Sequence, residues 1–190
     1  MEEIVMTEQE IYEACKKIGE KISLDLKDEE RIPLIIGVMK GGLPFMMDLI
    51  KYISIPIMLD FIQVSSYTGT SRSKEVKLVK DITFDVTGRT IILIDDVVDS
   101  GNSLLYLKNH FEKNYKPKKV LTCALFDKVN AREADIEVDY SGKILMENKF
   151  LCGYGLDYLE IYRNTPYVFV PSKEELDELN KFLKERGENI

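Results

Sequence analysis

An apolar run that ends in carboxylates and a small polar turn constrains this chain more than any other segment. Residues 91–94 read Ile-Ile-Leu-Ile without polar alternation, which is typical of a parallel strand covered on both faces. The polar residues that follow are Asp95, Asp96, Asp99 and Ser100–Ser103. Apolar residues then repeat at helical spacing from Leu104 to Phe111. The segment therefore predicts a strand, a tight turn and a helix, with the acids at the carboxyl end of the strand, where α/β sheets bind ligands.

The turn after this strand has the groups that a phosphate site requires. Backbone N–H groups at a helix start can hold a phosphate dianion, Gly101 permits close approach, and the hydroxyls of Ser100 and Ser103 add donors. The acids cannot bind that phosphate, but they suit sugar hydroxyls, a bridging Mg²⁺ ion or a proton to be moved. From the residues alone, two acids after a strand can also be a solvated strand end. A G-x-x-x-x-G-K-[ST] loop is absent, which argues against a P-loop NTPase.

Composition limits the class of protein. A chain of 190 residues with 45% hydrophobic content predicts one compact domain over residues 1–190. The net charge of −7 gives no general attraction to nucleic acid or to an anionic membrane. No apolar run reaches the length of a membrane span and the start lacks a signal-peptide pattern, so we expect a cytoplasmic protein. Cys15, Cys123 and Cys152 have no metal spacing and are expected to be reduced, packed thiols.

Strands and helices alternate along the chain. Strands are expected at residues 33–39, 55–64, 75–80, 91–94, 120–126 and 167–170, and helices after the capping boxes at 7–10 and 172–175, around 45–50 and at 104–111. This order predicts an α/β fold with a twisted, mainly parallel sheet and helices on both faces. We expect the polar stretch 65–74 to form a mobile hairpin tip. Residues from Ala131 onward are expected to lie outside the sheet as a small hood.

The central segment resembles the phosphoribosyl-pyrophosphate motif of the type I phosphoribosyltransferases. That motif is written as apolar residues, two acids, two apolar residues, Asp, Ser/Thr, Gly, any residue and Ser/Thr, and residues 91–103 fill every position. Further segments match in order and narrow the resemblance to the hypoxanthine-guanine phosphoribosyltransferases. It implies the type I phosphoribosyltransferase fold, with a small hood and a flexible hairpin loop. It also implies transfer of 5-phosphoribosyl from phosphoribosyl pyrophosphate to hypoxanthine or guanine, giving IMP or GMP and pyrophosphate.

The resemblance implies a set of residues that bind phosphoribosyl pyrophosphate. They are Lys40, Gly41, Ser66, Tyr67, Asp95, Asp96, Val98, Asp99, Ser100, Gly101, Asn102, Ser103 and Arg163. Lys40 and Arg163 would neutralise the leaving pyrophosphate, and the loop that carries Ser66 and Tyr67 would fold over the site and exclude water. The family pattern also predicts a strained Met39–Lys40 peptide that is cis in at least some states.

A second set is implied for the base and the metal. Asp99 would be the catalytic acid or base at purine N7, and Lys128, which can only donate, would select a 6-oxo group. Phe150 would stack on the purine and Leu151 would read its edge through main-chain groups. The base-binding set also includes Asp157, which would hold a second Mg²⁺ ion, while Asp95 and Asp96 would bind the ribose hydroxyls and the water shell of the first. His110, the sole histidine, is expected at the surface and not in catalysis.

Two alternatives stay open. A variant that accepts xanthine, or only hypoxanthine, differs by contacts around Leu151 and Asp157 that the sequence does not resolve. Some proteins of this fold are instead nucleotide-sensing regulators that bind RNA or DNA. Retained Asp99, Lys128 and Arg163 and the acidic net charge disfavour that reading. The expected partners are therefore small-molecule substrates, with no nucleic acid and no membrane, and the family implies a homo-oligomer, a dimer or a tetramer.

Overall fold

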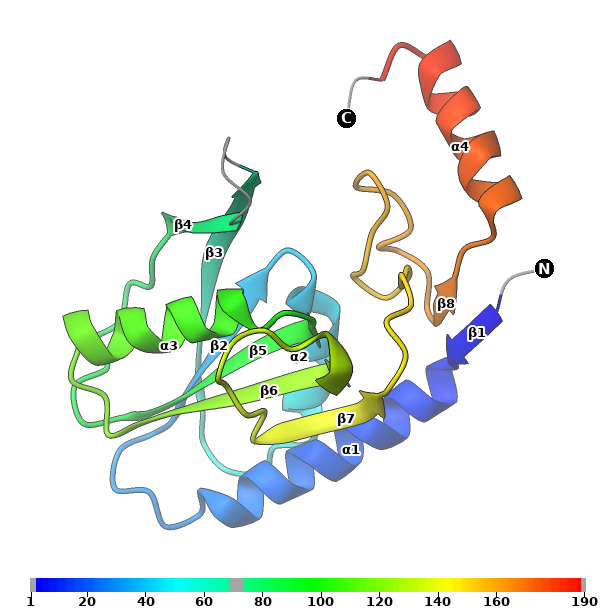
Figure 1. The fold of residues 1–190 in the computed structure, drawn as a ribbon. Coiled ribbons are helices and arrows are strands. Elements are labelled where there is room, and N and C mark those ends of the chain that lie inside the picture. The colour runs from blue at the N-terminus through cyan, green and yellow to red at the C-terminus, as the bar shows by residue number, and fades with distance from the viewer. Residues whose placement is uncertain (1–2, 69–73, 189–190) are drawn as a thin grey trace.

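The computed structural model of the chain describes residues 3–68 and 74–188 (Figure 1). In chain order the strands are β1 (Glu3–Met6), β2 (Leu34–Met39), β3 (Met58–Thr68), β4 (Lys74–Lys80), β5 (Thr90–Val98), β6 (Lys119–Lys128), β7 (Tyr140–Leu145) and β8 (Val168–Val170). The α-helices are α1 (Glu8–Asp25), α2 (Gly42–Leu49), α3 (Asn102–Asn114) and α4 (Lys173–Glu185), and short 3-10 turns span Ile50–Tyr52 and Val129–Ala131. None of the helices in this described part is both long and apolar enough to cross a membrane.

The main sheet is mostly parallel, as expected. Six strands of the described chain form it in the order β4-β3-β2-β5-β6-β7. Pairing is parallel throughout except between β3 and β4, which form an antiparallel hairpin. The run Ile91–Ile94 on β5 is fully buried, because the sheet is covered on both faces. Since parallel strands end at the same edge, the ends of β2, β5 and β6 bring their loops together.

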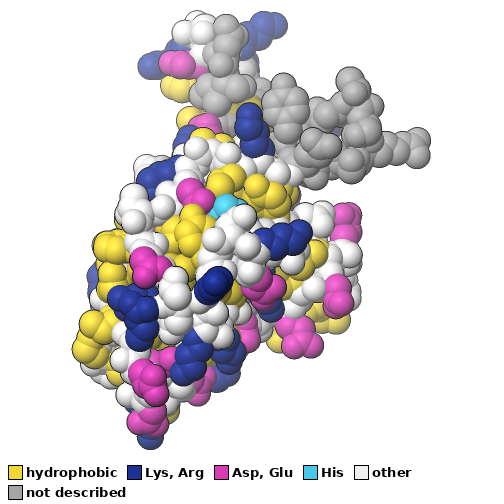
Figure 2. All heavy atoms as spheres, turned by 90° about the vertical axis from the view of Figure 1, so that its left-hand side faces the viewer, with side chains coloured by type: hydrophobic (Ala, Val, Ile, Leu, Met, Phe, Trp, Pro, Cys, Tyr) yellow, Lys and Arg dark blue, Asp and Glu magenta, His cyan; other side chains and the backbone are white. Residues whose placement is uncertain are grey.

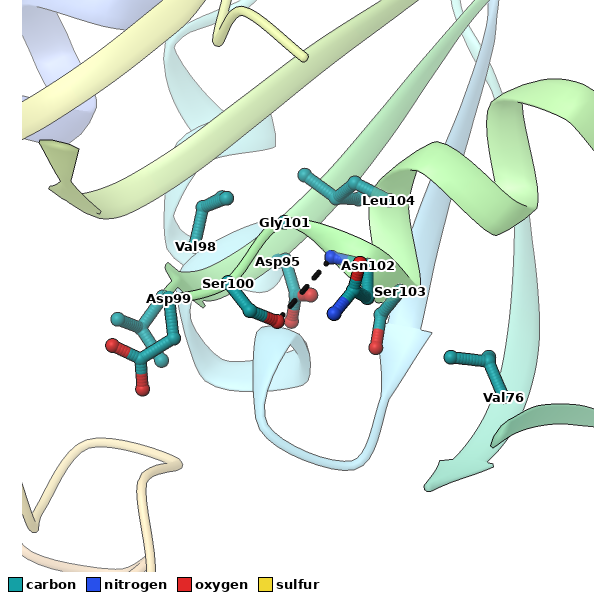
Figure 3. Close-up of a pocket in the computed structure, with 10 residues that line it drawn as sticks. Val76, Asp95, Val98, Asp99, Ser100, Gly101, Asn102, Ser103 and Leu104 are labelled. Atoms are coloured by element: carbon teal, nitrogen blue, oxygen red, sulfur yellow. Dashed lines mark hydrogen bonds between the residues drawn. The ribbon is translucent and has the colours of Figure 1, made fainter. Parts of the chain in front are cut away.

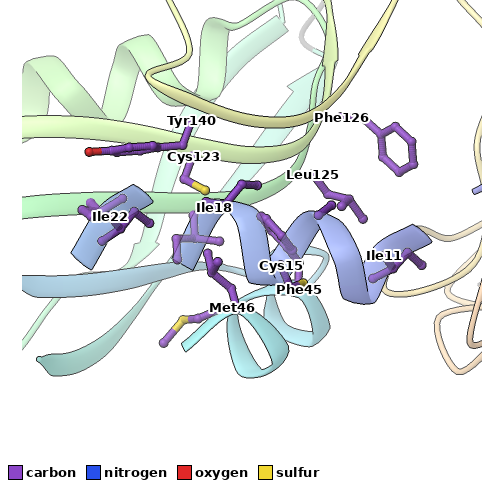
Figure 4. Close-up of a cluster of buried hydrophobic side chains, with 14 of the residues drawn as sticks. Ile11, Cys15, Ile18, Ile22, Phe45, Met46, Cys123, Leu125, Phe126 and Tyr140 are labelled. Carbon is purple, nitrogen blue, oxygen red and sulfur yellow. The ribbon is translucent and has the colours of Figure 1, made fainter. Parts of the chain in front are cut away.

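Helices cover both faces of this sheet. Ile18 of α1 and Phe45 of α2 pack with Leu125 of β6 in one apolar core, which Figure 4 shows between the helices and the sheet. Leu107 and Phe111 of α3 fill a second core on the opposite face. All three cysteines are buried and free, as expected for thiols that pack as small hydrophobes.

The extent of the sheet beyond residue 131 differs from the prediction. Residues from Ala131 onward were expected outside the sheet, but β7 extends it by pairing parallel to β6, with Cys123 opposite Tyr140. Strand β7 is at the edge of the sheet and is mostly half-exposed. Its sequence, Tyr-Ser-Gly-Lys-Ile-Leu, therefore lacks the long apolar run that marks a buried strand. Its strand conformation therefore depends on a long-range backbone pairing that local pattern does not reveal.

The hairpin strands are longer than predicted. Strand β3 begins at Met58 rather than at residue 55 and continues to Thr68, because the antiparallel pairing runs on from Ser65–Lys77 to Thr68–Lys74, at the start of β4. Residues 65–68 therefore belong to a strand, and not to a loop as expected. Residues 69–73 lie outside the described residues, so the mobility expected of the tip stays a prediction.

A second, small sheet joins the two ends of the chain. Strand β1, which the sequence analysis did not predict, pairs antiparallel with β8. The β7–β8 segment, residues 146–167, leaves the main sheet at the carboxyl end of β7 and returns to β8 (Figure 1). Beyond β8, α4 begins at the predicted capping box of Ser172 and Glu175. The β7–β8 segment carries many of the residues that the sequence assigned to the base and to pyrophosphate.

Candidate active site

The phosphate turn has the predicted local structure. Strand β5 continues to Val98, so Asp95 and Asp96 lie within the strand rather than after it. Gly101 is the N-cap of α3 and has a left-handed conformation with φ of 79°, which glycine adopts without steric cost. Gly101 has no side chain to cap the start of α3, and the only side-chain contact of its first amide among the described residues is a long one, to Ser100 Oγ. The first-turn N–H groups of this helix are therefore positioned to bind an anion.

A cavity of about 180 Å³ opens at this turn. It is lined by Val76, Asp95, Val97, Val98, Asp99, Ser100, Gly101, Asn102, Ser103 and Leu104. Figure 3 shows the hydroxyl of Ser100 and the carboxylate of Asp95 on the same side of the turn, whereas Asp99 points away from it. The Asn102 N–H donates to Ser100 Oγ at 3.4 Å, a contact that a bound anion can replace. The cavity thus combines hydrogen-bond donors that can bind a phosphate with a neighbouring carboxylate, that of Asp95.

The loop after β2 lies directly on the acids of β5. A Cβ atom at Gly41 would be 2.0 Å from Asp96 Oδ2, and one at Gly42 would be 2.7 Å from the Ile94 carbonyl oxygen. Only glycine allows so close an approach. The Met39–Lys40 peptide bond is cis, as the sequence analysis expected. Because Gly41 lies against Asp96, the backbone of the adjacent Lys40 is next to the acidic end of β5.

The β7–β8 segment packs on this same loop. Gly155 has a φ of 98°, and a Cβ atom there would be 2.2 Å from the Gly41 carbonyl oxygen. The Arg163 Nη1 group donates to the Gly155 carbonyl oxygen at 2.6 Å, and its Nη2 is 2.7 Å from Asp157 Oδ1. Arg163 and Asp157, which are both predicted site residues, are thus held together next to the loop that carries Lys40.

Glu160 is a charged residue of this region that the sequence analysis did not identify. Its Oε2 atom is 2.9 Å from Lys40 Nζ and 3.1 Å from Arg163 Nη2. No local pattern reveals this contact, because it joins residues 120 positions apart in the chain. The one indirect signal was that Lys40 and Arg163 are both assigned to pyrophosphate, and two such cations repel each other unless an anion lies between them.

The predicted base-side residues form a second ion pair. Lys128 Nζ, at the end of β6, is 2.9 Å from Asp99 Oδ1, just past the end of the adjacent strand β5. The Lys128 side chain is only 5% exposed, whereas that of Asp99 is 53% exposed. A buried ammonium and an accessible carboxylate are thus presented side by side. One can donate a hydrogen bond to a ligand and the other can accept one.

The other two base-side residues differ in exposure. Phe150 is exposed, with its ring edge-to-face against Tyr158 at a centroid distance of 6.0 Å, so one face is accessible for stacking. Leu151 is buried and belongs to the core, which leaves only its main chain for recognition. The backbones of Ser66 and Tyr67 lie in β3, but their side chains lie outside the part that the structure describes.

Burial controls the charge of the two strand acids. Desolvation raises the pKa of Asp95 well above its ordinary value, and the neighbouring Asp96 charge raises it further. Burial also raises the pKa of Asp96, although the charge of Arg163 opposes that shift. Without a cation, ionising both carboxyl groups is therefore unfavourable.

The donor set fits a magnesium ion that is shared with a substrate. Within the described residues no group of three or more His, Cys, Asp or Glu side chains could hold a metal ion alone. Mg²⁺, however, is usually held by one or two carboxylates together with substrate oxygens. The adjacent pair Asp95 and Asp96 has that character. Asp157 stands apart from them in its ion pair with Arg163.

His110 lies outside the candidate site and is partly covered by its neighbours. Its ring is 13% exposed, and Nε2 is 2.8 Å from Asp81 Oδ2. Tyr115 donates to the same Asp81 oxygen at 2.9 Å. His110 is thus partly covered by Asp81, which follows β4, but it is not buried and still reaches the surface, as expected. The expectation that His110 has no catalytic part stays a prediction.

Comparisons with known proteins identify the family. Residues 3–159 match the model of the phosphoribosyl transferase domain. The chain is 43% identical over 175 residues to the hypoxanthine-guanine phosphoribosyltransferase of Streptococcus pyogenes, covering 92% of this chain and 95% of that protein. It is 43% identical over 171 residues to that of Bacillus subtilis, covering 90% and 93%. The solved hypoxanthine phosphoribosyltransferase of Staphylococcus aureus superimposes with a TM-score of 0.84 at 35% identity, covering 90% of this chain and 92% of that one.

Replacing Asp95 by asparagine is expected to stabilise the ligand-free fold. A carboxyl group whose pKa is raised on folding contributes stability at low pH, and loses it as the pH rises through the folded-state pKa. At pH 7 in EDTA, Asp95→Asn should therefore raise the free energy of unfolding by about 1–2 kcal/mol. Urea unfolding from pH 4 to pH 8 measures this, and the gain should shrink toward pH 4. Asp28→Asn, at an exposed acid, is the control and should change little; a loss of stability in Asp95→Asn would contradict the burial argument.

Proposed function

This chain belongs to the phosphoribosyl transferase domain family, and we propose that it is a purine salvage enzyme of the hypoxanthine-guanine phosphoribosyltransferase type. It transfers 5-phosphoribosyl from phosphoribosyl pyrophosphate to N9 of hypoxanthine or guanine, releasing pyrophosphate. The observation that carries the proposal is the Asp99–Lys128 pair, 2.9 Å apart and directly beside the phosphate turn. A 6-oxopurine offers an acceptor at O6 and a site for proton exchange at N7, which match the two members of that pair.

The sugar phosphate would occupy the cavity at the start of α3. Ser100 and Ser103 line this cavity, and Figure 3 shows their hydroxyl groups at the start of α3. Together with the N–H groups of the first helical turn, they would stabilise a phosphate dianion. Gly101, Val98 and Asn102 complete the turn around it. Asp95 and Asp96 would then accept hydrogen bonds from the ribose hydroxyls. This arrangement supports the assignment of the turn to the 5-phosphate and of the acids to the sugar.

The leaving pyrophosphate would bind between Lys40 and Arg163. Lys40 is on the loop after β2, and Arg163 is on the β7–β8 segment that packs against this loop. The backbone of Gly41 in the same loop lies close to Asp96. As the glycosidic bond breaks, negative charge grows on the pyrophosphate and positive charge on the ribosyl ring. Fixed cations stabilise the first of these charges and nearby carboxylates the second. Ser66 and Tyr67 are proposed to add donors on the far side of the leaving group.

Magnesium is proposed as the cofactor, with one ion at Asp95 and Asp96 and a second at Asp157, each completed by oxygens of the substrate or water. When bound, it would neutralise charge on the pyrophosphate. A cation next to Asp95 and Asp96 would also counter the burial that raises the pKa of both acids, and thereby favour their ionised forms.

Base recognition would be shared by Phe150, Leu151, Lys128 and Asp99. The exposed ring of Phe150 can stack on a purine, and the main chain of Leu151 can read its edge. The Lys128 ammonium only donates, so it favours a 6-oxo group over a 6-amino group. Asp99 would accept the proton that the base loses, or return it, at N7. Whether xanthine is also accepted depends on contacts around Leu151 and Asp157.

The regulator alternative is less well supported. Figure 2 shows Lys and Arg side chains interspersed with Asp and Glu over the face that it presents, rather than gathered in one basic patch. The net charge of −7 also gives no general attraction to nucleic acid. The homo-oligomeric state, the cytoplasmic location and the single-domain organisation expected from the sequence stay predictions.

A panel of bases tests the function directly. Purified protein with phosphoribosyl pyrophosphate and Mg²⁺ should convert hypoxanthine or guanine to its nucleotide, and should leave adenine and uracil largely unchanged. The measurement is nucleotide formation, with xanthine included to define the base range. Preference for adenine or uracil would contradict the role of Lys128. No turnover with any base, together with RNA binding that competes with the sugar phosphate, would favour the regulator.

Asp99→Asn should lower turnover by about two to four orders of magnitude, because an amide cannot exchange the proton of the base. The affinity for phosphoribosyl pyrophosphate should stay nearly unchanged. Steady-state kinetics and equilibrium binding measure the two effects. Since the variant also leaves the buried Lys128 without its carboxylate partner, thermal unfolding must show that the variant is folded. Near-normal turnover would remove Asp99 from the mechanism.

Lys128→Gln should narrow the discrimination between hypoxanthine and adenine by about 1–3 kcal/mol, mainly through a loss of hypoxanthine activity. The physical reason is that glutamine can accept as well as donate a hydrogen bond. The ratio of kcat/KM values for the two bases measures this. Lys119→Gln, at the exposed start of the same strand, is the control and should keep the parental ratio. An unchanged ratio in Lys128→Gln would exclude the O6 contact.

A further inference from the structure

A single carboxylate oxygen joins the two cations that are proposed to hold pyrophosphate. Glu160 Oε2 is 2.9 Å from Lys40 Nζ, and it also lies 3.1 Å from Arg163 Nη2 and 3.3 Å from Arg163 Nε. The ion pairs with both cations hold the pKa of Glu160 below its ordinary value, chiefly through Lys40. The Glu160 side chain is 46% exposed, so a ligand from solution can reach the same cations.

The backbone places Glu160 there by an uncommon conformation. Leu159 and Glu160 have φ values of 49° and 63°, in the left-handed region that side chains other than asparagine and glycine rarely adopt. The Glu160 N–H donates to Asp157 Oδ2 at 2.9 Å, and the Ile161 N–H donates to the Tyr158 carbonyl oxygen at 3.0 Å. Asp157 thus holds the turn while its other oxygen pairs with Arg163. A costly conformation that its surroundings impose in this way indicates a functional constraint.

The four charged side chains of this cluster balance one another. Lys40 and Arg163 are cationic, and Asp157 and Glu160 are anionic, so the cluster is neutral without a ligand. Departure of Glu160 would leave one uncompensated positive charge at the position proposed for pyrophosphate. The ammonium and the guanidinium would then present their donors to an incoming anion.

We propose that Glu160 is an internal anion that takes the place of pyrophosphate between Lys40 and Arg163, and that a pyrophosphate group must displace it to bind. This inference rests on the proposed function of the same site. Glu160 neutralises the cations when the site is empty and competes with pyrophosphate when it is filled. Its return to Lys40 and Arg163 after the reaction favours release of the product. Glu160 thereby sets the affinity of the site for pyrophosphate without touching the reacting atoms.

The test is the affinity of wild type and Glu160→Gln for inorganic pyrophosphate in the presence of Mg²⁺, measured by titration calorimetry. Glutamine keeps the size of the side chain but removes the charge that competes. The dissociation constant should fall about three- to tenfold, as expected when two exposed ion pairs no longer oppose binding. The KM for phosphoribosyl pyrophosphate should fall with it. Glu178→Gln, at an exposed acid of α4, is the matched control and should leave both values unchanged.

The direction of the change separates competition from a merely structural role. If Glu160 instead orients Lys40 and Arg163 for the ligand, its loss weakens binding. Equal or weaker binding in Glu160→Gln would therefore overturn the proposal. Glu160→Asn is the second variant, because asparagine tolerates the left-handed conformation, and it should shift the affinity in the same direction. Binding in both variants should also depend more steeply on salt, since the site gains net positive charge.

Failure of this inference differs from failure of the proposed function. If the wild type forms IMP and binds pyrophosphate but the variants do not bind it more tightly, Glu160 is not a competitor and the enzyme assignment stands. If the wild type neither turns over any base nor binds pyrophosphate, both proposals are overturned. Tighter pyrophosphate binding in both variants with unchanged binding in Glu178→Gln supports the inference.

Discussion

The close approach of three backbone segments at the carboxyl end of β5 is the constraint on which the rest of the site depends. Gly41 and Gly42 bring the loop after β2 onto Asp96 and the Ile94 carbonyl group, and Gly155 brings the β7–β8 segment onto Gly41. Any side chain at these positions would push the layers apart. Without this contact, Lys40 and Arg163 would not stand together beside the acids. The packing of these backbone segments therefore sets the positions of the functional side chains.

Charge compensation is the second organising feature. Lys128 pairs with Asp99, and Arg163 and Lys40 share Glu160, so the cations expected to meet the substrate already have anionic partners. The buried charge of Lys128 would be strongly destabilising without its partner, whereas the more exposed pairs with Glu160 contribute little to stability. When a ligand binds, these cations therefore exchange an anionic side chain for an anionic group of the ligand, which limits the net gain in binding free energy. In the same way, desolvation raises the pKa values of the adjacent acids Asp95 and Asp96, and a bound cation would oppose that shift.

Much of the fold follows from local pattern. The capping boxes at Thr7 and Ser172 begin α1 and α4 as predicted, and the apolar run at 91–94 lies in the buried central strand. These elements could be predicted because their signals are local: a cap bond spans three residues, and burial on both faces removes polar alternation. Strand β7 escaped prediction because its pairing with β6, and not its own composition, makes it a strand. The extension of β3 to Thr68 has the same cause, since pairing with β4 extends it.

The sequence by itself determined the kinds of groups in the site and the turn that carries them. The acids of β5, Gly101 and the hydroxyls beside it are contiguous, so their order alone places them at one strand end and one helix start. Only the tertiary structure decided which charges meet. Asp99 contacts Lys128 because β5 and β6 are neighbouring strands. Glu160 contacts Lys40 because the left-handed backbone at residues 159–160 orients its side chain toward the loop after β2. Such contacts join residues far apart in the chain, and their geometry exists only after the sheet has assembled and the β7–β8 segment has packed on Gly41.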